Sequence, residues 1–421
     1  MNYQEIIDYL ESQRESHGPE YIKSALDLMG IDADPTKVIV VAGTNGKGTT
    51  SAVLQTLLAA SGKNVGFYSS PHLEHTTERI KFNCTDISRD DFCSVFHTVH
   101  EKISHLNLSH FEYLTVMAAY FFFETHKTEI NYAIFEVGVG GTFDATNAIP
   151  HSTCVITKLS MDHEDLLGNT IVGIAKNKFG IISANNIVFH QKFIPEIQEL
   201  SKEYAKKYSA RFVKSYDYLL KVDLSGKTPA FNVSTKVGDF TLGIPGNRAA
   251  ENFVLALTVF DHLVENAAQF LFAMKKVSWP GRMEKILYKN REIYLSGDHN
   301  PEGVRSLVEL LQHYKYEHAH LVVGICSDKK HTEMIDLFLS IPNSSLYLTE
   351  TPVKTLRLEE YDTQRVSKAR YASADFRDVI DAALDDAAEN DMVVVSGSLY
   401  LVGAVRIKDT DSHSHCCHRK Q

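Results

Sequence analysis

A glycine-rich segment with one lysine is the part of this sequence best suited to chemistry. It reads VIVVAGTNGKGTT over residues 38–50, so a β-branched apolar run ends at glycine and hydroxyl residues follow the lysine. A strand, a glycine turn and a helix in this order direct backbone N–H groups and the positive helix end at an anion, and the lysine adds a point charge. The segment therefore predicts a phosphate cradle, formed by Gly43, Thr44, Asn45, Gly46, Lys47, Gly48 and Thr49.

The segment departs from the strict phosphate-loop pattern GxxxxGK[ST] at two positions. Val41 occupies the first glycine position, and Gly48 follows Lys47 where the pattern has serine or threonine. The plain alternative is a glycine turn between a strand and a helix, with an exposed lysine. We favour the cradle because glycines, lysine and hydroxyls all fall where a phosphate needs them.

The elements that would position this loop alternate between strands and helices. Strand-like runs occupy 37–43, 64–70, 131–137 and 152–160, and residues 49–62 show helical spacing. This rhythm predicts an α/β fold, with an N-terminal phosphate-loop ATPase domain whose mostly parallel sheet has helices on both faces. Residues 113–123, YLTVMAAYFFF, are too few to span a membrane and predict a buried helix.

A second series of strands and helices begins near residue 291. Its strand-like runs are 291–297, 320–326, 345–350 and 392–398, and its helical runs include 301–314 and 376–389. This series predicts a smaller Rossmann-like α/β domain, joined to the first near residues 277–286. We expect domains at 1–283 and 284–408, and a disordered tail at 409–421.

One carboxylate stands out in the N-terminal series. Glu136 ends an apolar strand and precedes a glycine run. The carboxyl ends of parallel strands are where α/β sheets bind ligands. A carboxylate there is either an unpaired liability or a metal ligand.

The order and spacing of eight motifs then indicate a family. The chain resembles the folylpolyglutamate synthase and dihydrofolate synthase family, which is related to the Mur ligases. The motifs are HGPEYIKSALDLMGI (17–31), GTNGKGT (43–49), SSPHLEHTTERI (69–80), EVGVGGTFDATN (136–147), MDHEDLLGNTIVGIAKNKFGII (161–182), WPGR (279–282), SGDHNP (296–301) and SGSLYLVGAVR (396–406).

The resemblance implies an ATP-dependent ligase that joins L-glutamate to dihydropteroate, or to the γ-carboxyl of a folate, through an acyl phosphate, with ADP and phosphate as products. It implies two magnesium ions, with Glu136 as a ligand to both, Ser70 to the first and His163 to the second. Each of these residues alone could instead be a loop residue bonded to backbone. Lys47 and His163 would be catalytic, and so would Lys178.

Lys178 is the lysine that the resembling family carbamylates with carbon dioxide. The modification turns a cation into an anion, which could bridge metal or orient substrate, and it requires a neutral amine and hence a lowered pKa. The alternative is a solvated lysine near a helix C-terminus, where a cation is favourable. Asn177 stands before it in place of a family glutamate.

The resemblance also implies contacts from elsewhere in the chain. Asn252, Arg282, Asp298 and His299 would contact the nucleotide, and His299 and Ser398 would lie on the side of the incoming glutamate. Domain-linker packing is the alternative for Arg282, and a polar residue on a helix face is the alternative for Asn252.

Several positions depart from the family pattern. The family usually reads DGAHNP where this chain has Ser296 and Asp298. Residues two apart in an extended segment share a face, so Asp298 could replace the missing carboxylate. Thr142 stands where an arginine is common, and Arg248 and Ala249 replace a usual His-Gln pair. These changes bear on substrate detail and on full activity, and they leave the expected fold unchanged.

The net charge and the cysteine content indicate which partners and which compartment to expect. The formal net charge of −10 makes nucleic-acid or anionic-membrane binding unfavourable. The polar, acidic start resembles no signal peptide, and six scattered cysteines without a CxxC motif fit reduced thiols in a cytoplasm. We expect a cytoplasmic monomer that acts on small molecules. The tail residues His413, His415, Cys416, Cys417 and His418 could bind a soft metal, or form a frayed terminus.

Two other functions fit the sequence less well. A Mur-type cell-wall ligase would place a separate domain before the loop, but only 42 residues precede Gly43. A nucleotide-switch binding protein of the GTPase kind needs N/T-K-x-D after a strand. The segment TKLS at Thr157 has Ser160 in place of that aspartate.

Overall fold

The computed structural model describes residues 1–225 and 229–414. The chain divides into two compact units. The N-terminal unit holds residues 1–222, 232–243 and 248–277, and the C-terminal unit holds 223–231, 244–247 and the chain from residue 278 onward. The limits 1–283 and 284–408 stay a prediction, although a boundary after residue 283 would fall inside the strand Arg282–Tyr288.

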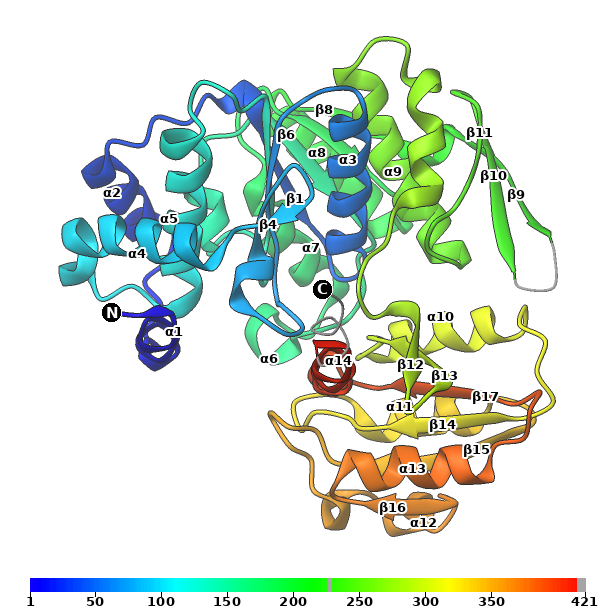
Figure 1. Cartoon of the computed structure of the whole chain (residues 1–421). Helices are drawn as coiled ribbons and strands as arrows, with labels where there is room; N and C mark the ends of the chain where they lie inside the picture. The colour runs from blue at the N-terminus through cyan, green and yellow to red at the C-terminus, as the bar shows by residue number, and fades with distance from the viewer. Residues whose placement is uncertain (226–228, 415–421) are drawn as a thin grey trace, which may run out of the picture. The chain divides into compact units, whose positions relative to one another are not determined.

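The N-terminal unit is built on an eight-stranded sheet (Figure 1). Its strands are β1 (Val38–Ala42), β2 (Val65–Tyr68), β3 (Ile80–Phe82), β4 (Thr85–Asp86), β5 (Tyr132–Glu136), β6 (Thr153–Ile156), β7 (Ile187–His190) and β8 (Arg211–Lys214). They lie in the order β4-β3-β2-β5-β1-β6-β7-β8. In this order the six strands β2-β5-β1-β6-β7-β8 are parallel to their neighbours, and β3 pairs antiparallel with both β2 and β4. The prediction of a mostly parallel sheet is confirmed.

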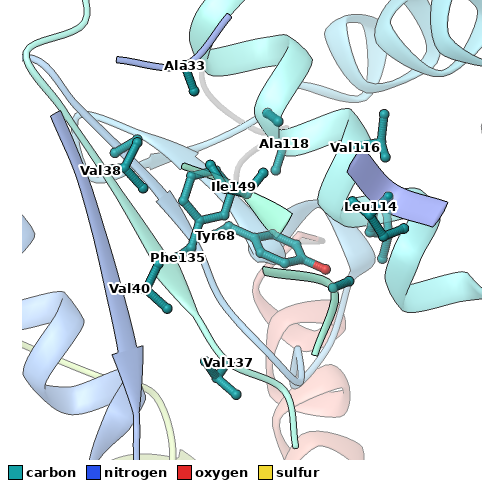
Figure 2. Packing of buried hydrophobic residues seen from close by; sticks show 14 of the residues in the cluster. Ala33, Val38, Val40, Tyr68, Leu114, Val116, Ala118, Phe135, Val137 and Ile149 are labelled. Atoms are coloured by element: carbon teal, nitrogen blue, oxygen red, sulfur yellow. The ribbon is translucent and has the colours of Figure 1, made fainter. Parts of the chain in front are cut away.

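The central strand β1 is buried on both faces. Val38 and Val40 join a hydrophobic cluster with Phe135 and residues of helix α5 (His110–Tyr120), as Figure 2 shows. Ile39 and Val41 are equally buried but point to the opposite face, because successive strand residues alternate. Helix α3 (Lys47–Ala60) packs against β1, β2 and β5. Burial on both faces explains why the strand reads as a continuous apolar run.

Helix α5 joins the sheet to the N-terminal helices α1 (Tyr3–Ser12), α2 (Pro19–Met29) and α4 (Arg89–Ile103). It begins with a capping box between Ser109 and Glu112. The Glu112 carboxylate also accepts from the backbone N–H of His17 (2.7 Å) and of Gly18 (2.9 Å), which ties the α1–α2 connection to α5. The predicted buried helix is confirmed. No helix in the described ranges is long and apolar enough to cross a membrane.

In the described chain before residue 278, four further α-helices and a second, smaller sheet remain. The helices are α6 (Glu164–Leu167), α7 (Ile171–Lys178), α8 (Pro195–Tyr208) and α9 (Asn247–Leu263). A separate three-stranded sheet has the order β11-β10-β9, and its strands are β9 (Leu219–Ser225), β10 (Ala230–Thr235) and β11 (Asp239–Thr241). Helix α7 ends at Lys178, so the candidate lysine lies in the last turn of a helix, as the sequence predicts.

The C-terminal unit is a second α/β layer structure. Its strands are β12 (Arg282–Tyr288), β13 (Arg291–Ser296), β14 (Ala319–Val323), β15 (Ser344–Thr349), β16 (Tyr371–Ser373) and β17 (Met392–Ser396), in the order β12-β13-β17-β14-β15-β16. β12 pairs antiparallel with β13, and the other neighbours are parallel. The helices are α10 (Pro301–Leu311), α11 (His331–Leu339), α12 (Thr363–Val366), α13 (Phe376–Asp386) and α14 (Leu399–Ser414). The predicted smaller α/β domain is confirmed.

The C-terminal tail is only partly described. Helix α14 continues to Ser414, so the segment predicted as a disordered tail, 409–421, begins inside a helix. His413 lies within this helix. His415, Cys416, Cys417 and His418 lie outside the described residues, and metal binding by the tail stays a prediction.

Candidate active site

The loop between β1 and α3 has the backbone that the phosphate prediction requires. The chain turns from Gly43 to Gly46 and enters α3 at Lys47. Gly46 caps α3 with φ +92°, in the left-handed region that favours glycine, and it offers no side-chain acceptor to the first helical turn. The N–H groups of that turn, on Lys47, Gly48 and Thr49, can therefore serve an external anion.

Two of the loop glycines are required by their neighbours. A Cβ built on Gly43 would overlap the hydroxyl of Thr157, and a Cβ built on Gly46 would overlap the side-chain amide of Asn252. The loop therefore lies directly against the segment after β6 and against helix α9. These contacts explain why this short turn keeps glycine at both positions.

The segment after β6 holds the loop in place. The backbone N–H of Thr44 donates to the Lys158 carbonyl at 2.8 Å, and its hydroxyl donates to the Ser160 carbonyl at 3.0 Å. The Ser160 N–H returns a bond to that hydroxyl at 3.1 Å. The TKLS segment at Thr157, considered above as a base-reading motif, thus anchors the phosphate loop. The sequence did not predict this role, although it did show that the segment follows a strand.

Two lysines meet at one carbonyl of the loop. The Lys47 Nζ donates to the Gly43 carbonyl at 3.3 Å, and the Lys178 Nζ donates to the same oxygen at 3.0 Å. Lys178 is only 4% exposed, so the solvated alternative for this residue is wrong. Burial and the neighbouring Lys47 charge lower the pKa of Lys178 to about 7, against the opposing influence of Asp162 and Asp144. A large share of its amine is therefore neutral at physiological pH.

The predicted metal ligands follow strands that neighbour one another in the sheet. Glu136 ends β5 and is 4% exposed, and the backbone N–H of Ser70, just after β2, donates to its carboxylate at 3.2 Å. A carboxylate and a hydroxyl are oxygen donors of the kind that Mg²⁺ prefers. The described residues hold no group of three or more His, Cys, Asp or Glu side chains that could bind an ion by themselves. Magnesium binding at Glu136 and Ser70 stays a prediction.

His163 lies farther along the same edge. It follows β6 by seven residues and precedes α6, where it adopts φ +52° and its N–H donates to the Asp162 carboxylate at 2.9 Å. A non-glycine residue in the left-handed region costs conformational energy, and such residues gather at functional sites. The predicted ligand to the second ion therefore has a distinctive backbone, and its role as a ligand stays a prediction.

Asn252 is not a surface residue of its helix. It is 3% exposed in α9 and lies against Gly46, and its side-chain oxygen accepts from the Gln191 amide at 2.8 Å. The Gln191 side chain is also 3% exposed, and its own oxygen has no partner among the described residues. Gln191, which sequence reasoning missed, therefore orients the Asn252 amide beside the loop. A lone glutamine after a strand carries no signal that would have revealed this.

In the C-terminal unit, the candidates gather where β13 ends. The Ser296 hydroxyl donates to the Asp298 carboxylate at 2.7 Å, so the two positions that depart from the family pattern are in contact. The Arg282 guanidinium donates to the Gly297 carbonyl at 3.1 Å, and a ring nitrogen of His299 lies 3.0 Å from that carbonyl. All four of these side chains thus make contacts within the short segment 296–299.

Ser398 follows β17, which neighbours β13. It is fully buried, its hydroxyl lies 3.3 Å from the Cys326 thiol, and it accepts from the Tyr400 N–H at 3.1 Å. The backbone also links the two strand ends, because the Gly397 N–H donates to the Asp298 carbonyl at 3.2 Å. Both ends lie at the carboxyl edge of this sheet, as the sequence predicts for a binding edge.

The two sets of candidates belong to different compact units. Within the N-terminal unit, the four strands β2-β5-β1-β6 are adjacent, and each leads at its carboxyl end into a predicted site residue. The structure therefore brings the loop, Glu136, Ser70 and Lys178 to one edge of one sheet. Within the C-terminal unit it brings Arg282, Asp298, His299 and Ser398 to one edge of the other.

Comparison with known proteins places the chain. The Mur ligase middle domain matches residues 41–260, and the Mur ligase, glutamate ligase domain matches residues 281–399. The chain belongs to the Mur ligase family. The matched ranges contain the phosphate loop and both strand-end groups.

Relatives of this Mur ligase family member include dihydrofolate synthases and folylpolyglutamate synthases. Dihydrofolate synthase/folylpolyglutamate synthase from Bacillus subtilis (strain 168) is 29% identical over 404 residues, 91% of this chain and 93% of that protein. The Mycobacterium tuberculosis folylpolyglutamate synthase complexed with ADP has a TM-score of 0.86 at 25% identity, covering 96% of this chain and 98% of that one. E. coli FolC in complex with DHPP and ADP has a TM-score of 0.82 at 25% identity, covering 98% and 99%. The resemblance to this branch of ligases is confirmed.

Proposed function

We propose that the chain is an ATP-dependent ligase that adds L-glutamate to dihydropteroate, to the γ-carboxyl of a folate, or to both. The substrate carboxylate would take the γ-phosphate of ATP, and the glutamate amine would then displace phosphate from the acyl phosphate to form the amide. One observation carries the proposal: a glycine loop that begins a helix lies beside a buried carboxylate, Glu136, at the carboxyl edge of one sheet. The named relatives support the substrate class.

The phosphate loop would hold the triphosphate. The first-turn N–H groups of α3 would donate to phosphate oxygens, and Lys47 would leave the Gly43 carbonyl to meet the terminal phosphates. Glu136 and Ser70 would hold one Mg²⁺, and Glu136 and His163 a second. Bound there, the ions neutralise charge that develops on the transferred phosphoryl group.

Lys178 would act as its carbamate. A neutral amine attacks carbon dioxide, its nitrogen forms the bond to carbon, and an N–H proton leaves to water, so the product is an anion. Burial beside Lys47 supplies the neutral amine, since the pKa of Lys178 is lowered to about 7. The same cation would stabilise the anionic product.

The C-terminal unit would supply the remaining contacts. In that unit, Arg282, Asp298 and His299 would serve as nucleotide contacts. In the N-terminal unit, Asn252 would do so beside the loop. His299 and Ser398 would face the incoming glutamate. Because Ser296 donates to Asp298, we propose that this pair does the work of a single strand-end carboxylate.

We propose further that the protein works as a monomer in the cytoplasm, on small molecules and without nucleic acid. The acidic net charge of −10 supports the last point. The described cysteines, Cys84, Cys93, Cys154 and Cys326, are all free thiols, which suits a reducing compartment.

Phosphate release tests the reaction. The purified chain is given MgATP and L-glutamate with dihydropteroate, tetrahydrofolate or a UDP-muropeptide as acceptor. We expect glutamate-dependent release with one or both pterin substrates, and its loss in Lys47→Ala and Glu136→Ala. Release with the muropeptide alone would contradict the proposal, and pyrophosphate as product would replace the acyl phosphate by an adenylate.

A further inference from the structure

The loop that follows the strand of Glu136 contacts the segment that holds the buried Lys178. It spans residues 137–147 and begins directly after Glu136. The Asp144 carboxylate braces it from inside. This carboxylate accepts from the N–H groups of Gly138 (2.9 Å), Val139 (3.0 Å) and Thr146 (3.0 Å), and from the Thr146 hydroxyl (2.6 Å). With Asp144 only 7% exposed, the loop is internally bonded rather than held by solvent.

The braced loop grips the chain on both sides of Lys178. On the preceding side, the N–H and the hydroxyl of Thr142 both donate to the Asn177 carbonyl at 2.9 Å. On the following side, the Asn147 amide donates to the Gly180 carbonyl at 3.2 Å, and to the Thr142 carbonyl at the same distance. The lysine backbone is thus held between two bonded carbonyls.

The packing between these bonds is also close. A Cβ built on Gly141 would lie 3.1 Å from the Lys178 Cα, and a Cβ built on Gly180 would overlap the Thr142 side chain. Satisfying the last carbonyls of α7 would by itself need only one donor from any source. Here two donors of one residue converge on the carbonyl just before Lys178, from a loop that starts at Glu136.

We propose that Thr142 is a positioning residue that holds the Lys178 amine in its buried place at the Gly43 carbonyl, in register with Glu136. Loss of its hydroxyl would loosen the end of α7 and let the amine move toward water. The inference rests on the proposed role of Lys178 as a carbamate. It adds a feature of this chain, because Thr142 stands where an arginine is common in the family.

The charges around the amine give the expected direction. Lys47 faces it and favours the neutral form, whereas Asp162 and Asp144 favour the protonated form. Burial is the largest influence that keeps the amine neutral. An amine that moves toward water would regain a higher pKa, so less of it would be neutral near pH 7.5 and less carbamate would form.

The test compares Thr142→Val, which removes the hydroxyl at nearly constant shape, with Thr142→Ser, which keeps it. The full chain is equilibrated with ¹³C-bicarbonate near pH 7.5, and the carbamate carbon is measured by NMR, with Lys178→Met as the blank. We expect Thr142→Ser to form as much carbamate as the protein with the natural sequence. Thr142→Val should lose carbamate by about fivefold, the factor that one ordinary hydrogen bond represents.

A second readout does not depend on carbamate. Isocyanic acid, which forms when cyanate takes a proton from water, adds to neutral lysine amines. The amine nitrogen bonds to its carbon, the C=N π bond opens, and one amine proton passes to the other nitrogen to give a neutral urea. The rate at Lys178 is followed against pH by peptide mass mapping. We expect the pH at the midpoint of this rate profile to lie higher in Thr142→Val than in Thr142→Ser or in the protein with the natural sequence.

The outcomes separate the two proposals. If the protein with the natural sequence shows no carbamate that depends on Lys178, the proposed modification fails. The pH midpoint of the cyanate reaction still decides the positioning role. Equal midpoints and equal carbamate in Thr142→Val and Thr142→Ser would overturn that role. If Thr142→Val does not fold, Asn147→Ala, which removes the donor to the Gly180 carbonyl, is expected to raise the cyanate midpoint, and an unchanged midpoint would overturn the inference.

Discussion

Replacing Lys178 by methionine should make the stability of the N-terminal unit depend differently on pH. The buried lysine has its pKa lowered from 10.5 to about 7 in the folded protein. Between these values the unfolded chain binds more protons than the folded one, so the free energy of unfolding rises with pH across this window. Methionine has a similar length and no charge, so it removes this dependence.

The magnitude follows from the two pKa values. A difference from 10.5 to about 7 corresponds to about 5 kcal/mol when the whole window is crossed. Between pH 7 and pH 9, where the folded protein withstands measurement, the protein with Lys178 should gain about 2 kcal/mol relative to Lys178→Met. Methionine also removes the bond to the Gly43 carbonyl, which changes the free energy of unfolding by an amount that does not depend on this titration. The test is therefore how the stability difference between the two proteins varies with pH, and not its value at one pH.

Urea unfolding of both proteins at pH 7, 8 and 9, in buffer freed of carbon dioxide, measures this change. The two compact units can unfold separately, so the comparison is confined to the transition that the substitution shifts. Other titrating groups are common to both proteins and cancel in the difference. A stability difference that stays constant from pH 7 to pH 9 would refute the reasoning, because it would mean that Lys178 titrates as an exposed lysine.

Three further substitutions test the site. Gly46→Ala should weaken ATP binding at least tenfold by calorimetry because its Cβ meets the Asn252 amide, whereas Gly62→Ala, at φ +80° with open space around it, should leave binding unchanged. Glu136→Gln should reduce Mg²⁺-dependent ATP turnover by about 100-fold or more, through loss of the anionic ligand; turnover near normal would remove Glu136 from the metal site. Asp298→Asn should lower ligase activity about tenfold, since the amide lacks the charge that we assign to this strand end; intact activity would show that Asp298 does not replace the family carboxylate.

Particular residues show how far the sequence carried the argument. The phosphate loop was predictable because glycine, lysine and hydroxyl types are set by local backbone and anion chemistry, and these are written in consecutive residues. Glu136 was predictable because an acid at the end of an apolar run is locally anomalous. The anchoring by Ser160 and the orienting bond from Gln191 were missed, since both join segments far apart in the chain and neither residue type is unusual in a loop.

The sequence by itself determined the alternation of strands and helices, and which residues end the strands, because hydrophobic periodicity and turn chemistry are local properties. Only the tertiary structure decided the state of Lys178. Its local sequence fits an exposed lysine at a helix end as well as a buried one, and the outcome depends on the 137–147 loop and on the Gly43 carbonyl, which lies 135 positions away. Burial and neighbouring charge set a pKa, and both arise only when distant segments pack together.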